Sequence, residues 1–264
     1  MKRQMNWIDC KKYADEIIEE VSKIPNKTKG LLVLTAGDDP ASAAYMRGKE
    51  KDCERCGIPF EKVKVNNQDE LMMAIKFANI VESVGGILVQ LPLPDGFDAE
   101  QAISAIAPEK DVDGFRADSP FLPCTPEGIL YILEKELGDL SGKAVLLIGK
   151  GKLVGKPLIP LLLDKGCTLT IAHSKTQNLD DKLWQYHDAV ITAVGKPKLV
   201  DLFVINSDYV IDAGISRDET GKLCGDCCYF SLDVKPLLNV TPVPGGVGLM
   251  TRAMLMKHMG EVNK

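Results

Sequence analysis

Residues 144–155, AVLLIGKGKLVG, decide the fold: five apolar residues run into a turn with glycine at positions 149, 151 and 155. Five consecutive apolar residues, bounded by turn signals, predict a strand that is buried on both faces of a parallel sheet. Glycines directly after a strand let backbone N–H groups approach a phosphate at the start of the next helix. The segment therefore predicts a strand, a turn and a helix that together open a dinucleotide-binding sheet.

Strands and helices alternate on both sides of this segment, which predicts layered α/β architecture with parallel sheets. Upstream we expect strands at 31–34, 60–65 and 86–91 and helices at 40–57, 70–79 and 129–137. Downstream we expect a helix at 154–163, strands at 168–172, 189–194 and 209–212, and a last helix at 250–259. Asp39 is the expected cap of the helix at 40–57, because Pro40 occupies the first helical position without loss of a hydrogen bond.

Composition bounds the class of protein. The chain has 264 residues, 45% of them hydrophobic and 26% charged, and its net charge is −5. This acidic balance argues against nucleic acid or a membrane surface as a partner, because both require a basic face. The N-terminus lacks the apolar core of a signal peptide, and no apolar run approaches the length of a membrane span. We expect a cytoplasmic protein of two modest domains.

Eight cysteines include two CxxC pairs, Cys53/Cys56 and Cys224/Cys227. Such pairs indicate zinc when about 15–20 residues separate them, and the separation here is far longer. The first pair also falls late in a predicted helix. We therefore expect reduced, unpaired thiols and no metal site, with a zinc-stabilised binding protein as the alternative.

Rigid loops lie between the predicted elements. Two prolines and three glycines occur between residues 241 and 248, TPVPGGVG, a run that suits a loop bringing bare backbone against a flat ligand. The stretch 89–94, VQLPLP, is similarly rigid, and PEKDVDG follows at 108–114. A turn-rich connector is the plainer interpretation of any one of these loops, but their succession favours a ligand site.

Together these motifs resemble the bifunctional methylenetetrahydrofolate dehydrogenase/cyclohydrolase family, in family order from about residue 31 to 256. The motifs that carry the resemblance are 38–42 with Tyr45 and Lys49, 89–94, 108–114, 123–128 and 241–248. The resemblance implies an N-terminal α/β catalytic domain, 1–138, a Rossmann-like NAD(P)-binding domain, 139–242, and a C-terminal helix that returns within 243–264 to complete the first domain. It also implies a homodimer acting on tetrahydrofolate derivatives.

Tyr45 and Lys49 are four residues apart and share one helix face. A lysine buried there would have a lowered pKa and could carry a proton, whereas the plainer interpretation is an exposed lysine beside a half-buried tyrosine. In the family this lysine is catalytic in the cyclohydrolase step, the tyrosine positions folate, and Gln90 hydrogen-bonds the lysine. From the residues alone, Gln90 is either a core amide or a group presented at the end of a strand.

Asp113 is either a turn residue before Gly114 or a carboxylate that pairs with the two N–H donors on a pterin edge. The resemblance implies the second role and makes Asp113 part of the catalytic set with Lys49, Tyr45 and Gln90. Asp111 we interpret as structural. The resemblance places the remaining substrate-binding residues in the rigid loops, at Leu91, Pro92, Pro244, Gly245 and Gly246.

The expected cofactor is NADP, with NAD as the alternative. No acidic residue ends the strand at 168–172, where an NAD-specific enzyme would hold the ribose hydroxyls. Lys150 and Ser174 could instead hold a 2′-phosphate. The family commonly has arginine and serine at the positions of Lys150 and Gly151, and proline where this chain has Leu249. The predicted cofactor-binding residues are Gly149, Lys150, Gly151, Ser174 and Ile215.

The resemblance implies two linked reactions: NADP-dependent oxidation of 5,10-methylenetetrahydrofolate to the methenyl compound, and hydrolysis of that compound to 10-formyltetrahydrofolate. The alternatives are retention of only one activity, or a different NAD(P)-dependent dehydrogenase of similar architecture, such as a shikimate-type enzyme.

Overall fold

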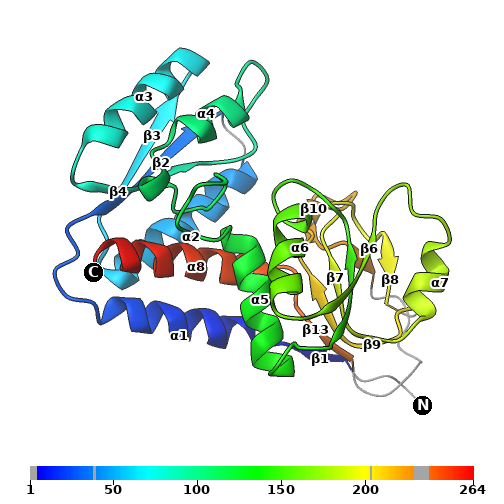
Figure 1. Cartoon of the computed structure of the whole chain (residues 1–264). Coiled ribbons are helices and arrows are strands. Elements are labelled where there is room, and N and C mark those ends of the chain that lie inside the picture. The colour runs from blue at the N-terminus through cyan, green and yellow to red at the C-terminus, as the bar shows by residue number, and fades with distance from the viewer. Residues whose placement is uncertain (1–4, 38–39, 203, 229–237) are drawn as a thin grey trace. The chain divides into compact units, whose positions relative to one another are not determined.

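The structure is a computed structural model that describes residues 5–37, 40–202, 204–228 and 238–264 (Figure 1). The chain forms two compact units. The three-stranded unit comprises Ala14–Cys124 and Arg252–Lys264, and the six-stranded unit comprises Met1–Tyr13 and Thr125–Thr251. The end of the chain therefore packs with the first sheet, and the predicted return of the C-terminal helix is confirmed.

The sheet of the three-stranded unit is parallel throughout, with β2 between β3 and β4. Helix α2 connects β2 to β3, and α3 connects β3 to β4. The elements are β2 (Gly30–Ala36), α2 (Pro40–Cys56), β3 (Phe60–Val65), α3 (Gln68–Ile80) and β4 (Val84–Val89). The third strand thus ends two residues earlier than expected, and Gln90 directly follows it.

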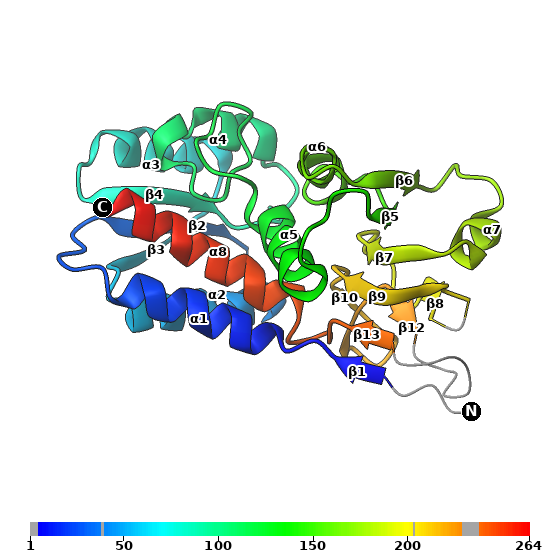
Figure 2. The ribbon, with the colours of Figure 1, turned by 60° about the horizontal axis from the view of Figure 1, so that its bottom comes forward.

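Helices cover both faces of this sheet (Figure 2). Helices α3 and α4 (Ala99–Ala105) lie on one face, and α1 (Cys10–Ser22), α2 and α8 (Val247–Val262) lie on the other. Apolar residues of the strands and of α3 and α4 form a buried core that includes Leu34, Leu71, Ile75, Ile87 and Val89. Helix α1 was not expected from the sequence.

Side chains fix the ends of these helices. The Asn67 side chain accepts a hydrogen bond of 2.9 Å from the backbone N–H of Glu70 and so caps α3. At the other end of α3, Lys110 Nζ donates to the carbonyl oxygens of Ala78 and Val81 at 2.9 and 2.8 Å. Pro40 is the first residue of α2, as predicted. The predicted cap of that helix, Asp39, lies outside the described residues.

The six-stranded sheet is also parallel, in the order β1-β13-β9-β7-β5-β6. Its strands are β1 (Met5–Trp7), β5 (Ala144–Ile148), β6 (Thr168–Ala172), β7 (His187–Thr192), β9 (Ser207–Asp212) and β13 (Leu238–Val240). The main helices are α5 (Cys124–Leu137), α6 (Gly155–Asp164) and α7 (Leu179–Trp184). The predicted α/β class with parallel sheets is confirmed.

Strand β5, which the apolar run 144–148 forms, lies in the interior of this sheet, and residues 145–148 are almost fully buried. Its side chains pack with those of β7, β9 and β13 in one apolar core, which includes Leu146, Val190, Val210 and Val240. The remaining elements are short: η1 (Pro108–Lys110), β8 (Val200–Asp201), β10 (Ser216–Arg217), β11 (Leu223–Cys224) and β12 (Cys227–Cys228). Among the described helices, none has the length and apolar character needed to cross a bilayer.

Candidate active site and cofactor site

Lys49 is a buried lysine on α2, with only 4% of its surface exposed. Its ammonium donates a hydrogen bond of 2.9 Å to Gln90 Oε1, and it lies 4.9 Å from the centre of the Tyr45 ring. The other end of the Gln90 amide donates to the carbonyl oxygen of Leu91 at 2.8 Å, so the amide oxygen faces the lysine. The structure thus brings together three of the four predicted catalytic residues, Tyr45, Lys49 and Gln90.

Burial lowers the pKa of Lys49, because the charged amine loses its hydration. Nearby Asp113, Cys124 and Cys53 act in the opposite direction and raise the lysine pKa, whereas Arg252 lowers it further. A lysine with a lowered pKa gives up its proton more readily and can then act as a proton acceptor. The site therefore holds a group suited to proton transfer.

Asp113 is partly buried on the loop that follows η1. Burial raises the pKa of its carboxyl group, and Lys49, a hydrogen bond from Cys124 and His258 lower it. The next residue, Gly114, has φ +73° and lies so close to the carbonyl of Leu122 that a Cβ would collide with it. The tight turn therefore requires glycine and fixes the direction in which Asp113 is presented.

Buried groups behind Asp113 hold its loop. The Asp111 carboxylate accepts a hydrogen bond of 2.7 Å from the backbone N–H of Arg116, which agrees with its predicted structural role. His258 on α8 contacts the carbonyl oxygen of Val112 through Nδ1 at 2.8 Å. The Sγ atom of Cys124 lies 3.6 Å from the same nitrogen. Sequence reasoning missed Cys124 and His258, because only the fold brings them to the aspartate.

Two of the rigid loops, 89–94 and 241–248, each contain a cis peptide bond. It is Leu91–Pro92 in the first and Val243–Pro244 in the second. The first loop directly follows Gln90 in the three-stranded unit, and the second directly precedes α8 in the six-stranded unit. A Cβ at Gly246 would collide with the Pro242 carbonyl, so this loop folds tightly on itself.

The predicted phosphate-binding turn lies between β5 and α6. Gly149 has φ +112°, and a Cβ there would collide with the Ala193 carbonyl, while a Cβ at Gly155 would collide with the Gly149 carbonyl. Nothing lies within 4 Å of the Cβ position of Gly151, and no side chain caps the start of α6. Close-packed glycine backbone beside an uncapped helix N-terminus fits a dinucleotide phosphate.

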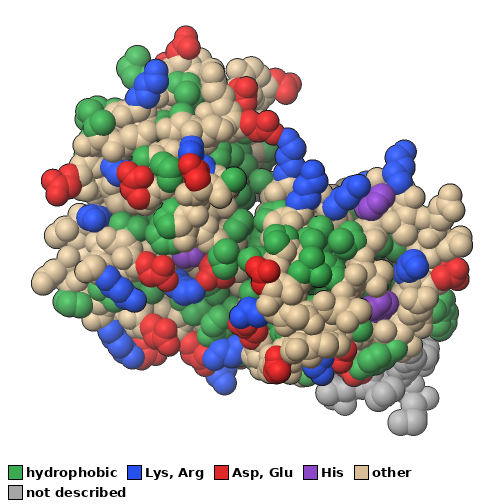
Figure 3. Space-filling model, viewed as in Figure 1, with side chains coloured by type: hydrophobic (Ala, Val, Ile, Leu, Met, Phe, Trp, Pro, Cys, Tyr) green, Lys and Arg blue, Asp and Glu red, His purple; other side chains and the backbone are tan. Residues whose placement is uncertain are grey.

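Lys150 and Ser174 lie at the ends of neighbouring strands. Ile148 and Ala172 are partners in the parallel pair β5–β6, and each predicted residue follows its strand by two positions. Both side chains are exposed. The turn at 173–176 is closed by Thr176, whose N–H donates to the His173 carbonyl at 2.8 Å. Figure 3 shows lysine or arginine side chains and a histidine gathered near the ends of α6 and β6.

Two buried carboxylates, Asp212 and Asp226, organise the loops around this turn. Asp226 accepts hydrogen bonds from the backbone N–H groups of Val194 and Lys196 at 2.6 and 2.9 Å. Asp212 accepts four, from the Thr192 hydroxyl and from the N–H groups of Gly214, Asp226 and Cys227. Both aspartates are at most 1% exposed. Sequence reasoning missed this network, because its partners are up to 32 residues apart.

Ile215 follows the network on the loop after β9, and 60% of its surface is exposed. Its Cδ1 atom lies 3.7 Å from the Cβ position of Gly248, at the start of α8. An exposed apolar side chain beside glycine backbone suits contact with a flat ring.

The thiols of the first CxxC pair, Cys53 and Cys56, have structural partners. Cys53 Sγ lies 3.7 Å from Met256 Sδ, and Cys56 Sγ lies 3.8 Å from the Ile18 carbonyl oxygen. Burial raises the pKa of Cys53 to about 12 and that of Cys56 to about 11, which disfavours the thiolate that a metal requires. The described residues contain no group of three or more side chains arranged to hold a metal ion.

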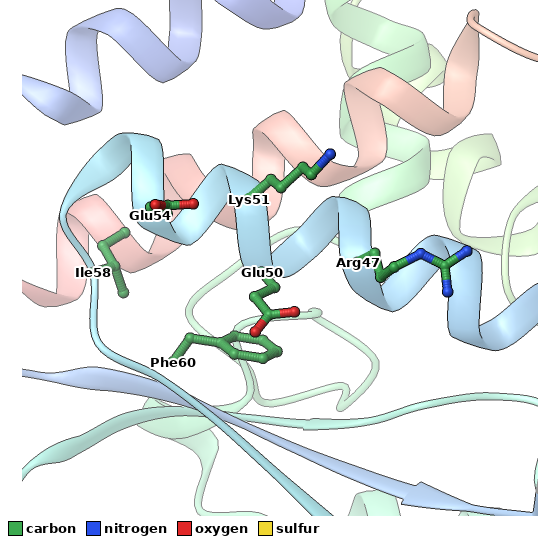
Figure 4. A pocket seen from close by; sticks show the side chains of 6 residues that line it. All are labelled: Arg47, Glu50, Lys51, Glu54, Ile58 and Phe60. Atoms are coloured by element: carbon green, nitrogen blue, oxygen red, sulfur yellow. The ribbon is translucent and has the colours of Figure 1, made fainter.

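An open hollow of 550 Å³ lies on the other side of α2 (Figure 4). It is lined by Arg47, Glu50, Lys51, Glu54, Ile58 and Phe60. By helical periodicity its four α2 residues occupy the face opposite Tyr45 and Lys49. The hollow is therefore separate from the lysine site.

Family models match both parts of the chain. Residues 8–113 match the catalytic domain of tetrahydrofolate dehydrogenase/cyclohydrolase, and residues 123–264 match its NAD(P)-binding domain. The bifunctional protein FolD of Agathobacter rectalis is 43% identical over 95% of this chain and 94% of its own.

Solved structures of related enzymes support the same family assignment. Bifunctional FolD from Campylobacter jejuni has a TM-score of 0.90 and 36% identity, covering 98% of this chain and 99% of its own. The Trypanosoma brucei enzyme, solved with NADP and an inhibitor, has a TM-score of 0.87 and 30% identity, covering 97% and 96%. This chain belongs to the tetrahydrofolate dehydrogenase/cyclohydrolase family.

Proposed function

We propose that this chain catalyses both reactions of its family: NADP-dependent oxidation of 5,10-methylenetetrahydrofolate to 5,10-methenyltetrahydrofolate, and hydrolysis of the product to 10-formyltetrahydrofolate. The observation that carries the proposal is the buried Lys49 bonded to Gln90 and paired with the Tyr45 ring. Family membership and the glycine turn between β5 and α6 support the cofactor-dependent oxidation.

In the hydrolytic step, water attacks the amidinium carbon, and Lys49 accepts a proton from that water. The C–N5 bond then breaks as the new hydroxyl group loses its proton and N5 gains one. The formyl group remains on N10, and the one proton released overall is the one on Lys49. The hydrogen bond to Gln90 fixes the position of the Lys49 amine, so the proton acceptor stays close to the reacting carbon. The lowered pKa of the lysine makes its neutral form available for this work.

Asp113 is the proposed partner of the pterin edge, because a carboxylate accepts from two adjacent N–H donors in one plane. Tyr45 offers a ring face to the folate, and Leu91, Pro92, Pro244, Gly245 and Gly246 offer apolar and backbone surface. In the dehydrogenase step these residues only orient the folate, because hydride loss from the methylene carbon needs no strong acid or base.

NADP would accept the hydride, and the residues around the β5–α6 turn fit it. We propose that Gly149 and Gly151 bind its diphosphate, that Lys150 and Ser174 bind its 2′-phosphate, and that Ile215 contacts a ring. Two positive features support NADP over NAD: an exposed cation after β5, and a hydroxyl instead of an acid after β6.

We also propose the functional boundaries 1–138 with 243–264 for folate chemistry and 139–242 for the cofactor, together with a cytoplasmic homodimer. None of the eight cysteines, all of which lie among the described residues, forms a disulfide, which supports a reducing compartment. The dimer rests on the family alone. Light scattering on the purified protein tests the dimer, because one chain has a mass of 28.8 kDa and a dimer has twice that mass.

One assay tests the function. The enzyme is mixed with methylenetetrahydrofolate and either NADP or NAD, and reduced cofactor and methenyl compound are followed by absorbance. We expect reduction of NADP faster than of NAD, and separate hydrolysis of added methenyl compound without any cofactor. Cofactor reduction that does not depend on folate would overturn the proposal.

A further inference from the structure

Arg252, on α8, lies against the turn of α2 that carries Lys49. A Cβ at Gly48 would collide with the Nη1 atom of Arg252, so the guanidinium occupies the space that a side chain at 48 would fill. One turn further along both helices, Cys53 contacts Met256 at 3.7 Å. The two helices therefore run side by side here, and the guanidinium lies beside the residue that precedes the lysine.

A buried carboxylate holds this guanidinium. Asp52 Oδ2 lies 2.9 Å from Arg252 Nε, and their side chains are 4% and 20% exposed. Neither atom has a hydrogen-bond partner of good geometry among the described residues, so charge holds the pair together. Asp52 also faces Arg55, at 3.9 Å. Arg55 itself pairs with Asp15 at 2.7 Å, so Arg252 is the nearer of the two guanidiniums that Asp52 faces.

The groups around Lys49 act on it in opposite directions. Asp113 from the η1 loop, Cys124 from α5 and Cys53 from α2 all favour the protonated amine, while Arg252 from α8 favours the neutral one. Tyr45 and Gln90 complete the surroundings, through a ring face and an amide oxygen that also suit a cation. Arg252 is the cation in this set, and it opposes the Asp113 carboxylate.

We propose that Arg252 is a positioning residue of the hydrolytic step, a fixed cation beside the Lys49 turn that keeps this lysine ready to accept a proton. A guanidinium suits the task because it stays charged at every accessible pH. Gly48 admits it and Asp52 anchors it. The inference rests on the proposed role of Lys49 in hydrolysis, and its test separates the two ideas.

The test titrates Lys49 directly in the whole protein. Lysine labelled with ¹³C at the ε carbon is followed by NMR against pH, and the signal absent from Lys49→Met identifies Lys49. We expect Arg252→Gln to raise the Lys49 midpoint by about 0.5–1 pH unit. Arg252→Lys, which keeps the charge, should stay closer to wild type. Gly48→Ala displaces the guanidinium without removing it and should raise the midpoint by a smaller amount.

The pH profile of methenyl hydrolysis is measured on the same variants. The inference is supported if the pH at which hydrolytic activity changes shifts upward together with the NMR midpoint of Lys49. An ion pair that only stabilised the fold would not shift the pH profile of hydrolysis. If the midpoint moves and the pH profile does not, Arg252 acts on Lys49 and the proposed role of Lys49 fails instead. If Arg252→Gln and Gly48→Ala both titrate like wild type, the inference is overturned.

Discussion

Two buried charged residues in each unit differ in the kind of partner they have. In the three-stranded unit, the buried Lys49 and Asp52 have side-chain partners. In the six-stranded unit, Asp212 and Asp226 are equally buried, but their partners are mainly backbone N–H groups. A buried charge bonded to backbone shapes loops, whereas one facing another side chain can take part in chemistry.

The exposed Lys150, at the proposed cofactor site, contrasts with the buried Lys49. Its proposed role is to bind a phosphate rather than to exchange a proton. On the proposed assignments, hydrolysis and cofactor binding depend on different residues in different units. Four substitutions test that separation, in order of decreasing effect.

Lys49→Met should have the largest effect. We expect hydrolysis of added methenyl compound to fall by about 10²–10⁴-fold, the contribution of a positioned proton carrier, while NADP binding is unchanged. Lys51→Met is the matched control, since Lys51 lies on the opposite face of α2 (Figure 4) and should keep full activity. Equal loss of hydrolysis and dehydrogenation would assign Lys49 to folate binding instead.

Asp226→Ala should destabilise the six-stranded unit by about 2–5 kcal/mol, because it removes the buried carboxylate that accepts from the partly buried N–H groups of Val194 and Lys196. Affinity for NADP should fall, since this loop packs against Gly149. Chemical denaturation and NADP titration measure the two effects, with the exposed Glu219→Ala as control. Normal stability would show that the network is dispensable.

Asp113→Asn should weaken folate binding by about 1.5–3 kcal/mol, because an amide presents a donor to a donor and loses the charge. Affinity for NADP should stay the same. Asp118→Asn removes an exposed carboxylate from the same loop and serves as control. Titration with folate decides between pterin recognition and a plain turn residue, and an unchanged affinity would favour the turn residue.

Lys150→Ala should have the smallest effect, about 1.5 kcal/mol or tenfold in NADP affinity, the lower end for a hydrogen bond to a charged group. NAD affinity should barely change, because NAD lacks the 2′-phosphate. Lys165→Ala, at the far end of α6, removes the same charge as a control. If both cofactors lose affinity equally, Lys150 contacts the diphosphate, and the basis of NADP preference lies elsewhere.

The sequence predicted the alternating elements and both parallel sheets, because long apolar runs such as 144–148 carry their own signal. It missed β1 and β13, which are three residues each and pair across more than 230 residues of chain. Helix α1 had a readable signal, since Tyr13, Ile17 and Val21 recur at helical spacing and Asp9 caps it at 3.0 Å.

The candidate site was predictable only in part. The Tyr45–Lys49 spacing gave a shared helix face, but the bond to Gln90 depended on the family resemblance. Arg252 had no sequence signal, because a glycine at 48 does not reveal which distant side chain fills its space. Asp226 stood inside a CxxC pair that suggested metal, and its loop-shaping role depends on partners that only the fold brings near.

We propose that hydride transfer and hydrolysis are separable, because Lys49 is needed only for hydrolysis. The test mixes the Lys49→Met enzyme with methylenetetrahydrofolate and NADP and measures NADPH and methenyl compound together over time. We predict that methenyl compound accumulates in a one-to-one ratio with NADPH, whereas in wild type it falls short because hydrolysis removes it. A variant that forms no NADPH, or that removes methenyl compound as fast as wild type, would show that Lys49 does not separate the two reactions.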